Sequence, residues 1–363
     1  MSRRRLDSSF LLPLASGLAS GAGFILSFIV LPLSRKLSFY YTIARRLWQQ
    51  KVCRLSARVQ CIAKAPRLQR RAFAVAFSDT LLDLGLLAHA VMGLLPSNAR
   101  CGGDIYFLQE PLTPKRLAHI RGKEIALVPQ SVTYLDPLMK VGKQVRGGRK
   151  DREAGKRQQA LFSQYGLPED TAEKYPFACS GGMSRRILLA TALMENPRLI
   201  IADEPTPGME LALAKKAMED FRRFADAGNG VLLITHDIEL ALEVADRIAV
   251  FYAGTTVEEA LVGDFASQEL LRHPYTRALW RAMPRNGFTP IDGAQPYVKD
   301  LPEGCVFGPR CPDFSSECLG EIPERVVRCG TVRCIKCRED DSHHHHGKGL
   351  ESAVKEANGH AGS

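Results

Sequence analysis

Leu199-Ile200-Ile201-Ala202-Asp203-Glu204, preceded by Ser180-Gly181-Gly182-Met183, carries the strongest structural signal in this 363-residue sequence. The first run is apolar and ends in two carboxylates, which is typical of a buried parallel strand that brings acids to the carboxyl edge of a sheet. The second is a Gly-rich turn leading into a helix predicted over residues 183–194; a Ser-capped helix N-terminus offers N–H groups to anions. Residues 231–237 repeat the strand design and carry a histidine at its end. These patterns predict an α/β fold.

The polar residues at these strand ends indicate chemistry on a nucleotide. Asp203 can hold a metal ion, Glu204 can act as a general base, and His236 adds a polar group at the next strand end. Together with a phosphate-binding turn, these residue types predict nucleotide hydrolysis. A buried strand ending in Asp is common by itself, so the prediction depends on the combination.

The order of these motifs resembles the ATP-binding subunit of an ABC transporter. On that resemblance, Ser180-Gly181-Gly182 is similar to the signature loop, residues 199–204 to the Walker B strand, and His236 to the switch histidine. Val128-Pro129-Gln130, after a predicted strand at residues 125–128, is similar to the Q-loop. The implied fold is α/β: a P-loop NTPase-like ABC nucleotide-binding domain with a helical subdomain and a small Cys-containing C-terminal segment.

The resemblance also implies a role for each matching residue. Asp203 would orient magnesium, Glu204 would polarise the attacking water, and His236 would contact the γ-phosphate of ATP. Gln130 would sense metal and nucleotide and pass that state to a membrane subunit. Ser180, Gly181 and Gly182 would close over nucleotide held by the other half of a dimer.

The family's phosphate loop, G-x-x-x-x-G-K-[ST], is missing. Residues 86–96 resemble the helix that normally follows it, but Ser78-Asp79-Thr80-Leu81-Leu82-Asp83-Leu84-Gly85 stands before them, without the Gly-Lys pair. Two explanations stay open. Either out-of-frame or rearranged sequence has replaced the N-terminal region, or the chain is a degenerate subunit that completes the composite ATP site of a second ATPase.

Residues 1–85 differ in composition from the rest of the chain. They hold 14 of the 49 basic residues but only three of the 39 acidic ones. The net charge of +10 therefore originates there and does not indicate nucleic-acid binding. Residues 10–33 lie in an uncharged run flanked by arginines and form a possible membrane segment. A signal or transit peptide is the alternative interpretation.

The expected domain organisation follows from these boundaries. Residues 1–85 stay unassigned, residues 86–265 form the ABC ATPase domain, and its helical subdomain covers about 131–185. Within that domain, residues 102–107 are predicted to form a hairpin strand of a small β-subdomain. An importer-type C-terminal segment covers residues 266–338. The polar residues 339–363 form a tail expected to be disordered.

The C-terminal segment resembles that of the oligopeptide, dipeptide and nickel importer ATPases. It contains four cysteines within a short, loop-rich stretch: Cys305, Cys311, Cys318 and Cys334. Four thiolates suit an iron–sulfur cluster, which some members of that subfamily carry, or zinc. The alternative is a small packed unit of reduced cysteines. Four consecutive histidines at 343–346 slightly favour nickel as cargo over peptide.

The combined interpretation is an ATP-binding, ATP-hydrolysing subunit that energises import of peptides or nickel. The resemblance implies ATP and Mg as cofactors, and as partners a second ABC ATPase, two membrane permeases and a solute-binding protein, with no nucleic acid. It implies peripheral attachment at the cytoplasmic face of the membrane. Alternatives are a non-hydrolysing partner subunit, a metal-sensing regulatory subunit, an integral membrane protein, and a soluble ABC protein of repair or translation.

Overall fold

The computed structural model describes residues 72–78, 81–99, 101–103, 105–297 and 300–337. The possible membrane segment at 10–33, the tail and its histidine run lie outside the described residues. In the described part of the chain, no helix has both the length and the apolar character needed to cross a bilayer.

An eight-stranded sheet organises the described chain, with strand order β4-β5-β6-β1-β7-β8-β10-β9. Strands β4, β5, β6, β1 and β7 run parallel, and β8, β10 and β9 extend the sheet in antiparallel fashion. The strand bounds are β1 Ala72–Ser78, β4 Ile125–Val128, β5 Leu199–Asp203, β6 Gly230–Thr235, β7 Arg247–Tyr252, β8 Thr255–Leu261, β9 Arg325–Val327 and β10 Gly330–Val332. A separate hairpin pairs β2 Tyr106–Phe107 with β3 Glu110–Pro111.

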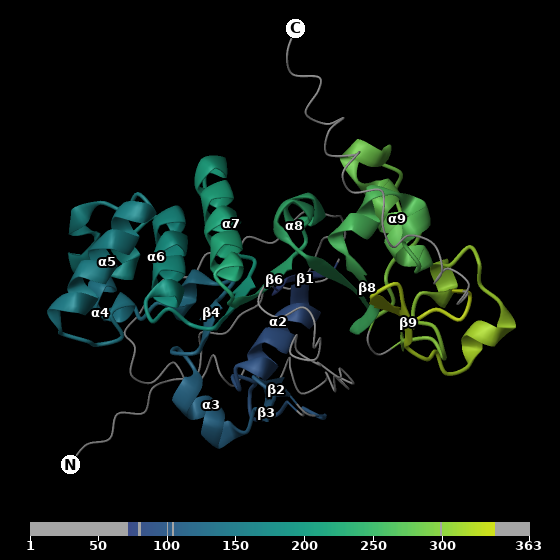
Figure 1. Cartoon of the computed structure of the whole chain (residues 1–363), viewed down its shortest axis with the longest axis horizontal. Helices are drawn as coiled ribbons and strands as arrows, with labels where there is room; N and C mark the ends of the chain where they lie inside the picture. The colour runs from purple at the N-terminus through teal and green to yellow at the C-terminus, as the bar shows by residue number, and fades with distance from the viewer. Residues whose placement is uncertain (1–71, 79–80, 100, 104, 298–299, 338–363) are drawn as a thin grey trace, which may run out of the picture. The chain divides into compact units, whose positions relative to one another are not determined.

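Helices cover both faces of the parallel strands. The bounds are α2 Leu81–Val91, α3 Pro114–Ile120, α4 Val141–Val145, α5 Arg152–Gln164, α6 Gly181–Leu193, α7 Leu211–Asp226, α8 Ile238–Val244 and α9 Pro274–Ala282. Helix α2 lies on one side of the sheet, and α7 and α8 lie on the other (Figure 1).

Side-chain alternation along β5 explains why its apolar run is unbroken. Ile200 packs in the large cluster with α6, α7 and α8, whereas Ile201 packs in the second cluster with α2 and α3. Both side chains are fully buried. Because both faces of a parallel strand are covered, every position must be apolar. The strands predicted at 125–128, 199–204 and 231–237 and the helix at 183–194 are confirmed to within two residues at each end.

Strand β1 lies at the centre of the sheet, between β6 and β7. It is upstream of residue 86, where the sequence patterns assigned no element. Only Asp79 and Thr80 separate β1 from α2. This is the place in the topology where a strand, a phosphate loop and a helix would follow one another, and here the strand and helix are joined without that loop.

Candidate functional site

Two acidic residues lie where β5 ends, at the carboxyl edge of the parallel strands. Asp203 is the last residue of β5, pairs in register with Ile234 of β6 and is 6% exposed. Glu204 follows with a φ of +46°, a backbone region that non-glycine residues rarely adopt. Its N–H donates to the Ile234 carbonyl at 3.0 Å, which holds this turn in place. The turn is therefore strained, and it buries the Glu204 carboxylate at the end of the strand. Backbone strain of this kind is often found at functional sites.

Glu204 and His236 contact each other from neighbouring strand ends. The His236 backbone N–H donates to Glu204 Oε1 at 2.8 Å, and its Nδ1 lies 2.6 Å from the same oxygen. The tautomer of His236 that carries its proton on Nδ1 can donate to this carboxylate oxygen. The Glu204 side chain is 2% exposed, whereas that of His236 is 57% exposed. The structure thus brings together these two predicted site residues and leaves the imidazole accessible.

Asp203 lies in an environment that disfavours its charge. Burial raises the pKa of Asp203 to about 6, the Glu204 carboxylate adds to the rise, and Arg185 opposes it. Arg185, from α6, donates to the main-chain carbonyls of Glu204 (3.2 Å) and Pro129 (3.4 Å). Burial lowers the pKa of Arg185, but a guanidinium remains charged at neutral pH. One cation therefore links the ends of β4 and β5, next to the exposed Gln130.

Another side of this site comes from α2, which overlaps residues 86–96, the run that resembles the helix after the phosphate loop. A Cβ added to Gly85 would lie 3.2 Å from Asp203 Oδ2, so α2 approaches the acid closely. One turn later, His89 Nε2 bonds the hydroxyl of Tyr134 at 2.8 Å. Burial and the nearby Asp203 raise the pKa of Tyr134, and burial lowers that of His89. The fit for a magnesium ion is therefore partial: Asp203 suits the metal, but Gly85 offers no hydroxyl ligand.

The turn formed by Ser180, Gly181 and Gly182, the Ser-Gly-Gly turn, is exposed and pre-shaped. Ser180 caps α6 by accepting from the Met183 N–H at 3.2 Å. A Cβ added to Gly181 would meet nothing within 4 Å, whereas one on Gly182 would lie 3.3 Å from the Gly208 carbonyl. The free N–H groups of this helix start can therefore receive an anion from outside the chain.

The four predicted cysteines meet in the C-terminal segment. Cys305, Cys311, Cys318 and Cys334 all line one small enclosed cavity, called here the four-cysteine cavity. Burial raises the pKa of Cys305 and Cys334, and raises that of Cys311 to about 11. Across the described residues, no three His, Cys, Asp or Glu side chains form a group that could hold a metal ion. The cysteines therefore share a cavity, but their side chains as positioned here do not form a metal-ligating group.

His273 also lines the four-cysteine cavity. It is 1% exposed, and burial lowers its pKa to about 3, with the charge of Arg277 adding to the decrease. Its Nδ1 accepts from the Tyr275 N–H at 3.1 Å and so caps α9. None of the sequence motifs described above assigned a role to His273.

The fold and the strand-end acids define an α/β ATPase cassette, and comparisons with known proteins agree. The family described as "ABC transporter" matches residues 86–207, and that described as "Oligopeptide/dipeptide transporter, C-terminal region" matches residues 257–318. The oligopeptide transport ATP-binding protein AppD of Bacillus subtilis (strain 168) is 33% identical over 69% of this chain and 83% of that protein. The dipeptide transport ATP-binding protein DppD of the same organism is 35% identical, over 68% and 80%.

A solved structure described as "Structure of ATP binding subunit of ABC transporter" matches at a TM-score of 0.48 and 20% identity, over 55% of this chain and 83% of that chain. On the sequence relationships, the chain belongs to the ABC transporter ATP-binding family, whose members are transport ATPases. The resemblance drawn from the motifs is therefore confirmed.

Proposed function

We propose that this chain is an ATP-binding subunit of a peptide importer and works in a dimer with a second ATPase. In that dimer, the Ser-Gly-Gly turn closes over nucleotide held by the phosphate loop of the second ATPase. One observation carries the proposal: the exposed, capped turn at the start of α6 is kept, whereas β1 runs into α2 without a phosphate loop. The chain therefore has what it needs to complete a neighbour's site and lacks what it needs for its own.

The chain's own acids keep the roles that the resemblance implies, also as proposals. Asp203 would orient magnesium, Glu204 would polarise water, His236 would contact the γ-phosphate, and Gln130 would respond to metal and nucleotide. The 2.6 Å contact between Glu204 and His236 supports the pairing of base and polar residue. Losing the phosphate loop removes much of the electrostatic stabilisation of the transition state. We therefore expect hydrolysis in the partner's half of the dimer.

Peptide is the proposed cargo because the relatives above are an oligopeptide and a dipeptide transport ATP-binding protein. Two membrane permeases and a solute-binding protein complete the proposed assembly, with this chain peripheral to the membrane. The proposed ATPase domain covers residues 86–265, to which β1 contributes a strand, and the C-terminal segment covers residues 266–338.

The test is ATPase activity of the purified complex with the second ATPase. Ser180→Arg places a long side chain on the turn and should lower the activity of the complex by about 100-fold, the scale of losing a transition-state contact. Glu204→Gln should leave it within about twofold, because the chain's own half contributes little. Ser163→Arg, on the exposed surface of α5, is the matched control and should change nothing.

Two results would contradict the proposal. If Glu204→Gln abolishes activity as completely as Ser180→Arg, the chain's own half is catalytic. If no complex containing this chain hydrolyses ATP, a non-hydrolysing regulatory subunit becomes the better description.

A metal at the four-cysteine cavity stays a separate proposal, because the four residues reach the same cavity. Ligation would require the raised thiol pKa values to fall, since only thiolates bind iron or zinc. Anaerobic reconstitution of the purified chain with iron and sulfide tests this. A visible absorption band lost in Cys311→Ser would support a cluster, and a colourless protein that also binds no zinc would exclude both metals.

A further inference from the structure

We propose that a second cavity in the C-terminal segment, the Arg333 cavity, binds a short peptide with free termini. Its volume is about 490 Å³, within the range of small-ligand sites. Its lining comes from five separate places in the chain: the start of β8, the start of α9, two loops around residues 303–306 and 319–322, and the residue after β10. It shares no lining residue with the strand-end acids or the Ser-Gly-Gly turn.

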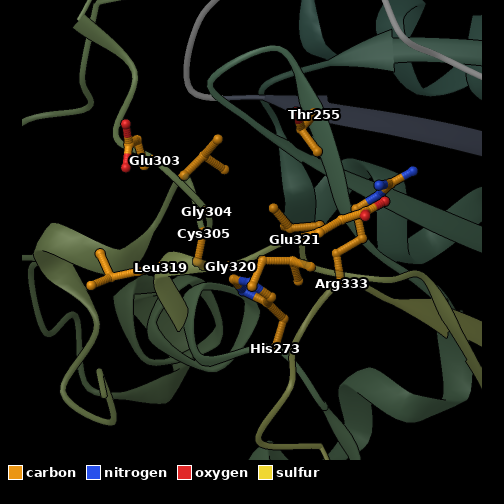
Figure 2. A pocket seen from close by; sticks show the side chains of 12 residues that line it. Thr255, His273, Glu303, Gly304, Cys305, Leu319, Gly320, Glu321 and Arg333 are labelled. Carbon is orange, nitrogen blue, oxygen red and sulfur yellow. The ribbon is translucent and has the colours of Figure 1, made fainter. Parts of the chain in front are cut away.

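Side chains of both charge signs line this cavity. Figure 2 shows Glu303 on one side and Arg333, with Glu321 and Thr255 near it, on the other. Arg333 donates one nitrogen to Glu324 at 3.3 Å, and a guanidinium has five N–H donors. A ligand that carries both an ammonium and a carboxylate could pair with Glu303 and with the remaining donors of Arg333.

A buried imidazole supplies a neutral donor at the base of the cavity. His273 is 1% exposed and lines the cavity, as Figure 2 shows. Because its Nδ1 accepts from the Tyr275 N–H, the ring proton lies on Nε2, the nitrogen remaining to serve a ligand. An Nε2–H group donates well to a peptide carbonyl or carboxylate, so the cavity offers a polar contact besides its charges.

The cavity walls are held rigidly, so a ligand would meet a preformed site. The buried carboxylate of Glu258 accepts from the backbone N–H groups of Arg272 (3.0 Å) and His273 (2.8 Å), which sets the position of the imidazole. The two loops are tied by the Cys305 N–H bond to the Cys318 carbonyl at 2.9 Å. Preorganisation of this kind lowers the ordering cost of binding.

The choice of a peptide, rather than another zwitterion, rests on the proposed import function. His273 and Cys305 line both the Arg333 cavity and the four-cysteine cavity. A ligand in the Arg333 cavity would therefore lie against two residues that also line the four-cysteine cavity. Peptide released inside the cell would be sensed at the end of the sheet opposite β4 and β5, away from the nucleotide site.

Isothermal titration of trialanine into the purified full chain, without nucleotide, tests the proposal. Measurable binding is expected, and acetylating the N-terminus or amidating the C-terminus should each weaken it by about tenfold, the scale of one charged hydrogen bond. Arg333→Gln and Glu303→Gln should weaken it similarly and should remove the effect of the matching terminal block. Glu219→Gln on α7 and Arg281→Gln on α9, both exposed, are the matched controls.

His273→Asn separates the cap from the donor, because Asn retains N-cap capacity while the imidazole N–H is lost. It should weaken trialanine binding with little change in the unfolding temperature. The proposal is overturned if the folded chain binds no trialanine, or if the doubly blocked peptide binds equally well. Since no ATPase readout is used, a negative titration leaves the proposed transport function standing, and an inactive complex leaves the cavity proposal standing.

Discussion

Glu258 is the residue whose removal should most damage the C-terminal segment. Its carboxylate is 0% exposed and accepts from the Arg272 backbone (3.0 Å), the Arg272 side chain (3.2 Å) and the His273 backbone (2.8 Å). Glu258→Ala leaves these donors unpaired around a buried guanidinium. Breaking a buried ion pair by deleting one partner costs about 3–5 kcal/mol. Asp264 still accepts from Arg272 at 2.9 Å, so we expect the lower end, about 3 kcal/mol.

The adjacent residue provides the matched control. Glu259 lies on the other face of β8, pairs with Arg247 at 2.6 Å, and has a side chain that is 36% exposed. Glu259→Ala should therefore cost only about 0.5 kcal/mol, the usual value for a surface pair. At ~2–4 °C per kcal/mol, the two variants should differ in unfolding temperature by about 5–10 °C.

The assay is thermal and urea unfolding followed by tryptophan fluorescence. Trp280 on α9 reports on this region because its indole N–H donates to the Phe265 carbonyl at 2.8 Å. The chain has two tryptophans, so a Trp48→Phe background isolates the signal. Equal losses for Glu258→Ala and Glu259→Ala would refute the reasoning, because burial would then not decide the cost of losing the charge.

Three further predictions concern other parts of the molecule. Because folding raises the pKa of Asp203 to about 6, the folded state binds more protons than the unfolded state between about pH 4 and 6, so stability should fall as pH rises through that window; Asp203→Asn should remove this slope in pH-dependent unfolding. Gly304→Ala should destabilise the C-terminal segment by more than about 2 kcal/mol in urea unfolding, because φ is +77° and a Cβ would lie 2.1 Å from a carbonyl oxygen, whereas Gly263→Ala, with open space, should not. Tyr134→Phe loses the 2.8 Å bond to His89 and should cost about 1 kcal/mol; an unchanged midpoint would mean that water replaces the bond fully.

Several features of this protein were predictable from local sequence alone. The apolar run of β5 is unbroken because the strand is covered on both faces, and it ends in Asp203. This pattern can be read from the sequence without a structure. The Ser180 cap was also predictable, because helix capping depends on residues only three positions apart in the sequence. The strand β4 was predicted at its observed bounds, whereas the strand predicted at residues 102–107 is formed only at 106–107.

Other features depended on contacts between distant residues. The family resemblance placed a helix after the phosphate loop, but no local pattern indicated that His89 and Tyr134 contact each other near Asp203, because that contact arises only when α2 packs on β5. The central position of β1 follows from its pairing with β6 and β7, which lie more than 150 residues downstream. Strand pairing over such separations leaves no local pattern to detect.

The C-terminal segment shows most clearly which features the local sequence predicts and which depend on the tertiary structure. Cysteine spacing predicted that four thiols would meet, and they do line one cavity. That spacing could not determine how closely they approach, nor that burial would raise the pKa of Cys305, Cys311 and Cys334. The Arg333 cavity likewise joins Thr255, His273 and residues 303–333 through folding alone. Local patterns thus set the strands, caps and motif residues, whereas side-chain environments were decided by tertiary packing, because burial and long-range neighbours determine charge, access and shape.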